Sequence, residues 1–201
     1  MRKVTKDNIY NGHRLYNASK NNQGFYAEIL NAIEMRFNYM IEAHSKVLFT
    51  RFDLRYPSGS TYKNDNELVS RFAEALRLYC KRKEYDPQYL WVRELSENNQ
   101  VHYHFMLLMN GNKIQNPYKL IHDYVLNLWK GCLGIQYGEG LVHYVYSNQS
   151  SGMILRNHPN LKQTIDAYYQ HASYLAKVYS KGNMPAFVNG YGCSRIPSSL
   201  H

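Results

Sequence analysis

The 201-residue sequence has no long apolar run, and no apolar stretch follows the charged residues at its N-terminus. A membrane-spanning helix needs about 18 consecutive apolar residues, and a secretory signal needs an apolar core, so we expect neither. The cysteines Cys80, Cys132 and Cys193 are odd in number and form no Cys-x-x-Cys pair. Because this usage is typical of a reducing compartment, the sequence predicts a soluble cytoplasmic protein without a membrane partner.

Acidic residues are scarce relative to basic ones. The chain has 15 Asp and Glu against 24 Lys and Arg, a net charge of +9, which favours an anionic partner such as nucleic acid. It also has 20 tyrosines, whose rings could stack on unpaired bases or simply line the core. A phosphate-binding Gly-x-x-x-x-Gly-Lys-Ser/Thr loop is missing from the sequence, so nothing predicts a helicase in this chain.

No internal repeat or low-complexity tract divides the sequence, and 44% of its residues are hydrophobic, which suffices for one core. We therefore predict one domain over residues 24–190. A basic arm over residues 1–23, either mobile or ordered on binding, precedes it, and an irregular tail over residues 191–201 follows.

Apolar periodicity predicts four helices and four strands. The expected helices cover residues 25–44, 66–80, a segment opened by Pro117, and 161 to about 180. The expected strands cover residues 47–55, 90–95, 101–108 and 141–146, and residues 147–159 read as a polar loop. This order predicts an α+β fold with a mainly antiparallel sheet and helices packed on one face.

The strand from Val101 to Leu108 contains two histidines, His102 and His104, at alternate positions. Alternate side chains of a strand share a face, so both imidazoles can reach one metal ion. Such spacing also arises by chance. The preceding strand contains Glu94, and a hairpin symmetric about Asn98 places Glu94 directly opposite His102. A buried carboxylate needs a positive partner, so we predict a divalent metal held by Glu94, His102 and His104.

The last expected helix contains Tyr174-Leu175-Ala176-Lys177. At 100° per residue Tyr174 and Lys177 lie off the apolar stripe and close to each other, so they are either ordinary surface residues or part of a site. Tyr168 and Tyr179 fall on the stripe and are expected to be buried, and Tyr169 lies on a different face from Tyr174. His171 borders the Tyr174 face and could contact the site or cap the core.

Three charged residues, Arg51, Asp53 and Arg55, share one face of the strand over residues 47–55. They could line a groove that binds DNA or form an ion-pair ladder at the edge of the sheet. Arg93 points away from Glu94 and is interpreted as structural.

These motifs, in this order, resemble the HUH endonucleases, in which a His-hydrophobic-His strand binds metal and a later tyrosine attacks DNA. The acid ahead of the His pair and the Tyr-x-x-Lys helix look like the replication-initiator branch. Arg51-Phe52-Asp53-Leu54-Arg55, the His pair and Tyr174-Leu175-Ala176-Lys177 look most like the inovirus (filamentous phage) gene-two replication proteins, which share their domain with the YagK/YfjJ prophage proteins. The resemblance covers about residues 25 to 190.

The resemblance implies an HUH/RRM-like sheet of about five strands and a replication-initiation nuclease. Tyr174 would form a 5′-phosphotyrosine, leaving a 3′-hydroxyl that primes rolling-circle replication of a phage, prophage or plasmid. Lys177 would lower the pKa of the phenol or bind the phosphate. Mg²⁺ or Mn²⁺ would be the metal, although imidazole and carboxylate ligands alone do not select an ion. Single-stranded or origin DNA would be the partner, with a host polymerase and either a host helicase or supercoiling.

Other functions remain open from the sequence. A DNA-binding regulator on the same scaffold would share the charge and the aromatic residues but would need neither metal nor Tyr174. A relaxase or transposase of the HUH group would use the same residues. A two-His, one-carboxylate iron oxygenase is disfavoured, because a cupin-like site has its acid after the His pair and Phe105 to Lys113 contains none.

Overall fold

The computed structural model of the protein describes residues 3–17, 23–96, 100–145, 151–179, 181, 185 and 187–197. The helices of these residues are α1 (Ala27–Ala43), α2 (Glu67–Arg82), a π-helical turn (Leu120–Val125) continuing into α3 (Leu126–Leu133), and α4 (Leu161–Ser173) followed by a 3-10 turn (Tyr174–Ala176). The strands are β1 (Val4–Thr5), β2 (Ile9–Tyr10), β3 (His13–Arg14), β4 (Phe25–Tyr26), β5 (Lys46–Arg55), β6 (Gln88–Leu95), β7 (Val101–Asn110), β8 (Val142–Tyr144), β9 (Ser151–Leu155) and β10 (Tyr191–Cys193).

The main sheet has six strands in the order β10-β6-β7-β5-β8, with β9 also paired to β5. Every pairing in it is antiparallel. β8 covers one half of β5, at Phe52 to Leu54, and β9 covers the other half, at Lys46 to Thr50. Both long strands β5 and β7 are therefore interior, which explains why their sequences are almost wholly buried.

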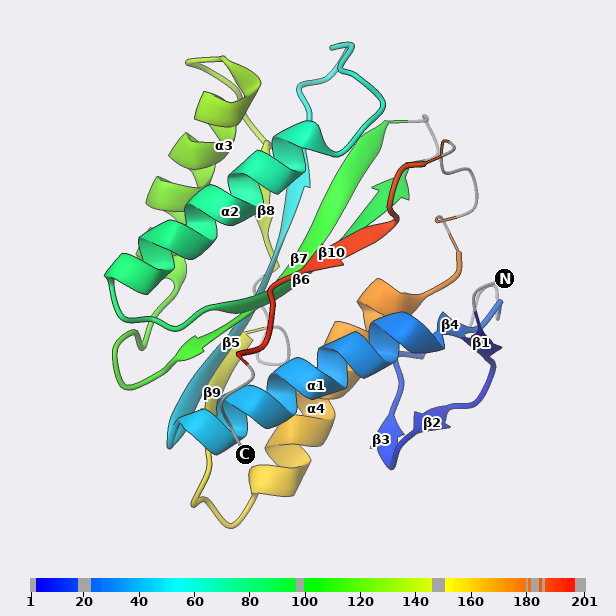
Figure 1. The fold of residues 1–201 in the computed structure, drawn as a ribbon, viewed down its shortest axis with the longest axis vertical. Coiled ribbons are helices and arrows are strands. Elements are labelled where there is room, and N and C mark those ends of the chain that lie inside the picture. The colour runs from blue at the N-terminus through cyan, green and yellow to red at the C-terminus, as the bar shows by residue number, and fades with distance from the viewer. Residues whose placement is uncertain are drawn as a thin grey trace.

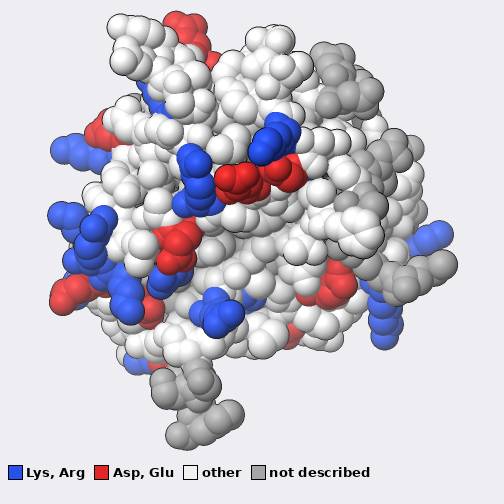
Figure 2. All heavy atoms as spheres, turned by 45° about the horizontal axis from the view of Figure 1, so that its top comes forward, with Lys and Arg blue, Asp and Glu red and all other residues white. Residues whose placement is uncertain are grey.

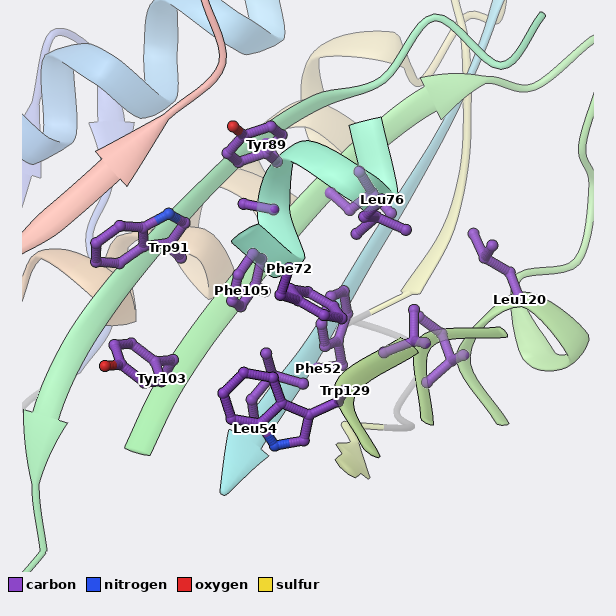
Figure 3. Close-up of a cluster of buried hydrophobic side chains, with 14 of the residues drawn as sticks. Phe52, Leu54, Phe72, Leu76, Tyr89, Trp91, Tyr103, Phe105, Leu120 and Trp129 are labelled. Carbon is purple, nitrogen blue, oxygen red and sulfur yellow. The ribbon is translucent and has the colours of Figure 1, made fainter. Parts of the chain in front are cut away.

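Helices cover both faces of the sheet (Figure 1): α2 and α3 lie on one face, and α1 and α4 lie on the other. On the α2/α3 face, Phe52 and Phe105 stack with ring centroids 4.9 Å apart, and Phe72 of α2 meets Phe105 edge-on at 5.4 Å. Trp129 of α3 closes this cluster (Figure 3). Full burial of each such side chain stabilises the fold by about 1.5–3 kcal/mol.

The second face takes the alternate residues of the same strands. Its apolar half packs Phe37 of α1 against Phe49 of β5, with ring centroids 5.6 Å apart, and Phe49 against Tyr168 of α4 at 5.1 Å. Along β7, Met106 and Leu108 belong to this face, and so do His102 and His104 by alternation. The end of this face that carries the histidines is the polar part of an otherwise apolar layer.

The α+β fold with its antiparallel sheet is confirmed, and the prediction that helices pack on one face is wrong. Two short strands were also missed: β9 lies within the segment predicted as a loop, and β10 lies within the predicted irregular tail. The last helix ends at Ser173, short of the predicted end near residue 180. Residue 180 of that predicted helix lies outside the described residues, and so does residue 146 of the strand expected over 141–146.

The predicted N-terminal arm is packed against the domain over its described part, residues 3–17. β1 pairs with β4, and β2 and β3 form a hairpin that lies beside α1 and α4. Nδ1 of His13 lies 2.7 Å from Oδ1 of Asp166 on α4, and Asn11 donates to Glu34 on α1. Leu15 is buried, and the backbone N–H of Tyr16 donates to Oγ of Ser173. The arm therefore reaches the end of α4, where Tyr174 follows.

Candidate metal centre and nucleophile

The pairing of three strands brings the predicted ligands together. Glu94 of β6 lies opposite His102 of β7, as the sequence predicts from a symmetric hairpin. On the other side of β7, Asp53 of β5 lies opposite His104, and Arg55 lies opposite His102. Side chains alternate along each strand, so all of these project toward the layer of α1 and α4. A rigid sheet rather than a loop therefore positions the site.

The ligand atoms of Glu94, His102 and His104 all lie within 4.8 Å of one another. Nε2 of His102 is 3.1 Å from Nε2 of His104. Oε2 of Glu94 is 3.3 Å from Nε2 of His104 and 3.9 Å from Nε2 of His102. Glu94 and His104 are buried, and His102 is partly exposed. The three donors thus surround one point that is open on the His102 side.

These separations fit a divalent cation. Two donors bound at about 2.1 Å lie about 3.0 Å apart at a right angle, and about 3.4 Å apart at a tetrahedral angle. The observed distances of 3.1, 3.3 and 3.9 Å lie close to this range. Imidazole nitrogen with carboxylate oxygen accepts several metals, including Mg²⁺, Mn²⁺, Zn²⁺ and Fe²⁺. The cluster could bind a metal ion, and its donors do not identify which one.

Asp53 orients the second histidine. Its Oδ1 lies 2.5 Å from Nδ1 of His104, and its Oδ2 lies 3.5 Å from Nδ1 of His143 on β8. Burial acts to lower the pKa of His104, but the hydrogen bonds to Asp53 and Glu94 outweigh it and raise this pKa. With Nδ1 committed to Asp53, Nε2 of His104 faces Glu94 and His102. A carboxylate behind a ligating histidine fixes both its tautomer and its ring orientation.

Lys181 is a buried partner of Glu94 that sequence reasoning missed. Its Nζ donates to Oε1 of Glu94, the oxygen that faces away from His104. Burial acts to raise the pKa of Glu94, but His104 and Lys181 outweigh it, so the carboxyl pKa lies far below its ordinary value. The charge of Glu94 is therefore balanced in the fold by Lys181 as well as by any metal. This contact spans 87 positions of sequence, and no local signal predicts it.

Tyr174 lies against the candidate ligands. Its ring meets His104 edge-on, with centroids 5.3 Å apart. Nζ of Lys177 lies 3.5 Å from the centroid of the Tyr174 ring, and Cζ of Arg51 lies 4.9 Å from it. Tyr16 of the N-terminal segment contacts the same ring edge-on at 5.1 Å. The structure thus brings together Tyr174, Lys177 and the three candidate ligands. Neither residue continues α4: Tyr174 begins a 3-10 turn after it, and Lys177 follows that turn.

Burial and charge set the protonation of this pair. Burial and the neighbouring Glu94 raise the pKa of Tyr174 to about 12, and Arg51 acts in the opposite direction. Burial lowers the pKa of Lys177 to about 8. Lys177 lies over the face of the phenol ring, where a cation–π contact forms. Further positive charge is needed to make Tyr174 a nucleophile near neutral pH.

The three charged residues of β5 have different environments. Arg51 is 3% exposed and donates from Nη1 to Nδ1 and to the backbone oxygen of His171, at 2.9 and 3.0 Å. Asp53 is buried against His104, and only Arg55 is exposed. Because β5 lies between β7 and the β8/β9 pair, the predicted ladder at a sheet edge is wrong. Arg51 and Asp53 are enclosed beside the candidate ligands and Tyr174, whereas Arg55 is exposed to solvent, and DNA contact by the three residues stays a prediction.

The two tyrosines of α4 itself are packed in the core, and Tyr179 beyond its end is not. Tyr168 is buried as predicted, and Tyr169 is fully buried with its hydroxyl donating to the backbone oxygen of Leu30. Tyr179 is 44% exposed, so its predicted burial is wrong. The helical projection fails there because the chain leaves the helix at Ser173. Arg93 forms hydrogen bonds with Asn64 and Asp65 on the opposite face, in keeping with a structural role.

A cleft begins at His102, the most accessible of the candidate ligands. It has a volume of about 570 Å³, and Arg55, Tyr56, Ser58 and Gln100 contribute to its walls. A second cleft of about 390 Å³, which shares Tyr56 and Gln100 with the first, continues toward Tyr62 and Lys63. A hollow with one guanidinium and two stacked tyrosine rings, Tyr56 and Tyr62, therefore adjoins the open side of the candidate metal centre.

Fold and site together define a mixed α+β protein whose antiparallel sheet carries a buried candidate His/His/Glu metal centre. A family model described as the YagK/YfjJ C-terminal domain matches residues 5–194, and the chain belongs to this family. It is 28% identical to the uncharacterized protein YfjJ of Escherichia coli (strain K12), over 77% of this chain and 88% of YfjJ. It is 26% identical to the uncharacterized protein YagK of the same organism, over 79% and 88% respectively.

The predicted likeness to the YagK/YfjJ proteins is thereby confirmed, whereas the wider likeness to HUH endonucleases stays a prediction. No helix in the described part of the chain has the length and apolar character needed to cross a membrane.

Proposed function

We propose that this protein nicks and rejoins a single DNA strand through a covalent link to Tyr174, in the manner of a rolling-circle replication initiator of a phage, prophage or plasmid. The observation that carries the proposal is the packing of the Tyr174 ring against His104, within the cluster that also holds Glu94 and His102. A lone metal centre or a lone tyrosine would not indicate strand transfer. Their contact does, because a phosphodiester can touch both at once.

In the proposed reaction Oη of Tyr174 attacks the phosphorus of a phosphodiester, and the bond from phosphorus to the 3′ oxygen breaks. The phenol proton leaves to solvent, and the departing 3′ oxygen takes up a proton to become a free hydroxyl. The product is a 5′-phosphotyrosine, and attack by a 3′-hydroxyl reverses the step and rejoins the strand. A divalent ion held by Glu94, His102 and His104 would supply charge stabilisation at the phosphate oxygens.

The cleft beside His102 supports DNA as the substrate class. Arg55 lies opposite His102 in the sheet and lines this cleft, where it could bind the phosphate next to the scissile one. Tyr56 and Tyr62 further along it could stack on bases. On the face drawn in Figure 2, basic and acidic side chains are interspersed, so the net charge of +9 is not gathered there into one broad patch.

One observation favours a second candidate, a DNA-binding regulator without nuclease activity. The ion pair between Lys181 and Glu94 lets the buried carboxylate exist without metal. A regulator would not need the contact between Tyr174 and His104, so we rank the regulator second to the nuclease.

The test is cleavage of supercoiled circular DNA from the parent replicon, with Mn²⁺ or with chelator, by the wild-type protein, Tyr174→Phe and Tyr179→Phe. We expect Mn²⁺-dependent nicking with protein attached to the 5′ end, and a loss of at least about 1,000-fold in Tyr174→Phe, since the variant lacks the hydroxyl that would form the covalent link. Tyr179, exposed and five residues away, is the matched control and should retain activity. An adduct that persists in Tyr174→Phe would refute the assignment, and DNA binding without nicking in every variant would favour the regulator.

A further inference from the structure

Lys181 forms a buried ion pair with Glu94, one of the three candidate metal ligands. The side chain of Lys181 is 0% exposed, and its ammonium group donates to Oε1 of Glu94. The other carboxylate oxygen, Oε2, lies near the two histidines. A cation placed among the three ligands would share this carboxylate with Lys181 across a buried, low-dielectric space, where charges repel strongly. The ion pair therefore opposes metal binding at the same time as it holds the carboxylate in position.

The charges around the centre point the same way. Two carboxylates, Glu94 and Asp53, lie within a group of three cationic side chains, Arg51, Lys177 and Lys181. Burial lowers the pKa of Lys177, Glu94 acts to raise it, and Lys181 and Arg51 act to lower it. A further divalent cation adds to this excess of positive charge, whereas an anionic phosphate relieves it. Metal and phosphate should therefore bind more tightly together than either binds alone.

We infer that Lys181 is a built-in counter-ion that keeps the affinity of the centre for divalent metal low until a phosphodiester enters, so that metal and DNA strand bind together. This inference rests on the proposed metal centre and goes beyond the proposed reaction, because it concerns the order and coupling of binding. Lys181 is a positioning residue under this inference, and it takes no part in bond formation.

The experiment measures Mn²⁺ affinity by the electron paramagnetic resonance signal of free Mn²⁺, with and without a short oligothymidylate. The variants are Lys181→Gln, which removes the charge and keeps a hydrogen-bond donor, and Lys181→Arg, which keeps the charge. Lys162→Gln is the matched control, because Lys162 also pairs with a carboxylate, Asp166, at the exposed surface of α4. We expect Lys181→Gln to bind Mn²⁺ at least tenfold more tightly than wild type, and Lys181→Arg and Lys162→Gln to stay within about threefold.

Oligothymidylate should tighten Mn²⁺ binding to the wild-type protein at least fivefold. The increase should be smaller in Lys181→Gln, because that variant already lacks one of the positive charges that the phosphate would offset. Unchanged or weaker Mn²⁺ binding in Lys181→Gln, or equal coupling in both proteins, would overturn the inference. Absence of Mn²⁺ binding in both proteins would overturn it together with the metal centre. Normal coupling without any nicking would leave the inference standing and remove the proposed reaction.

A folding defect in Lys181→Gln is informative as well. Without Lys181 the buried Glu94 loses its ion pair, so the melting temperature without metal should fall. Mn²⁺ should then raise the melting temperature of Lys181→Gln by more than it raises that of the wild type, because it replaces the missing charge. An equal or smaller rise would count against the competition between Lys181 and metal, even if the affinity could not be measured in the variant.

Discussion

The two faces of the main sheet are built from the same strands, yet they differ in chemistry. On β7, Tyr103 and Phe105 enter the aromatic cluster under α2 and α3, and their neighbours His102 and His104 enter the candidate centre under α4. The first face is mainly apolar, with the buried Arg93 as its charged exception, and the second is apolar mainly at the half that holds Met106 and Leu108. Burial of apolar side chains on the first face thus offsets the free-energy cost of burying charged groups on the second.

The largest effect is expected on the apolar face. Phe105→Ala should lower the free energy of unfolding by about 3–5 kcal/mol, because the ring stacks on Phe52 and meets Phe72, and its removal leaves a cavity. Urea unfolding at neutral pH measures this loss.

The control for Phe105→Ala lies three residues away and on the other face. His102→Ala should cost under about 1 kcal/mol of stability, because His102 is partly exposed, and it should lower Mn²⁺ affinity by at least tenfold. If His102→Ala destabilised the fold as much as Phe105→Ala, the division of roles between the two faces would be wrong.

A smaller effect on Mn²⁺ affinity is expected for Asp53, which orients the candidate ligand His104 and is not itself one of the three candidate ligands. Asp53→Asn should lower Mn²⁺ affinity by about 10- to 100-fold, because the amide no longer supports the charge and tautomer of His104. Asp86→Asn is a matched control: Asp86 lies 2.8 Å from Nε2 of His44, a similar His–Asp pair outside the site. Calorimetric titration with Mn²⁺ measures both. Equal affinities for Asp53→Asn and wild type would show that His104 needs no orienting partner.

The smallest effect concerns pH. Burial and Arg51 lower the pKa of His171 to about 4 from an ordinary 6.5, so the folded ring stays neutral where the unfolded ring takes up a proton. The stability from His171 is therefore fully present above pH 6.5 and is lost as the pH falls toward 4. Because the ring is only partly buried, we expect a loss of about 1–2 kcal/mol rather than the full value.

The measurement for His171 compares urea unfolding at pH 7 and pH 4.5 in the wild type and in His171→Gln, whose amide oxygen can accept the hydrogen bond from Arg51 and does not titrate. The variant should lose less stability on acidification by that 1–2 kcal/mol. Identical losses in the two proteins would show that His171 is not the group responsible.

The hairpin was the most predictable part of the site, because a strand period of two and a symmetric loop fix which residues face each other. Glu94 opposite His102 followed from these rules alone. The end of α4 was not predictable in the same way: no glycine or proline marks Ser173, and the projection extended to Tyr179 was wrong. The short strands β9 and β10 contain glycine and only weak alternation, so their pairing depends on distant partners.

Contacts between distant segments account for what sequence reasoning missed in the site. Lys181, Tyr16 and His143 come from three segments with no motif, and each reaches the centre only because the sheet and α4 bring it there. Asp53 was noticed for its position on a strand face, yet its role behind His104 required the register of β5 against β7. Local sequence patterns indicate which residues could bind a ligand, whereas the residues that orient those ligands are found only from the fold.

The contact of Lys181 with Glu94 also bears on biosynthesis. The ribosome makes the chain from the N-terminus, so the β6–β7 hairpin with all three candidate ligands is complete long before Lys181 is added. During that interval Glu94 has no ammonium partner from this position. The buried carboxylate of the hairpin therefore gains this charged partner only after the C-terminal segment has been made and Lys181 has reached Glu94.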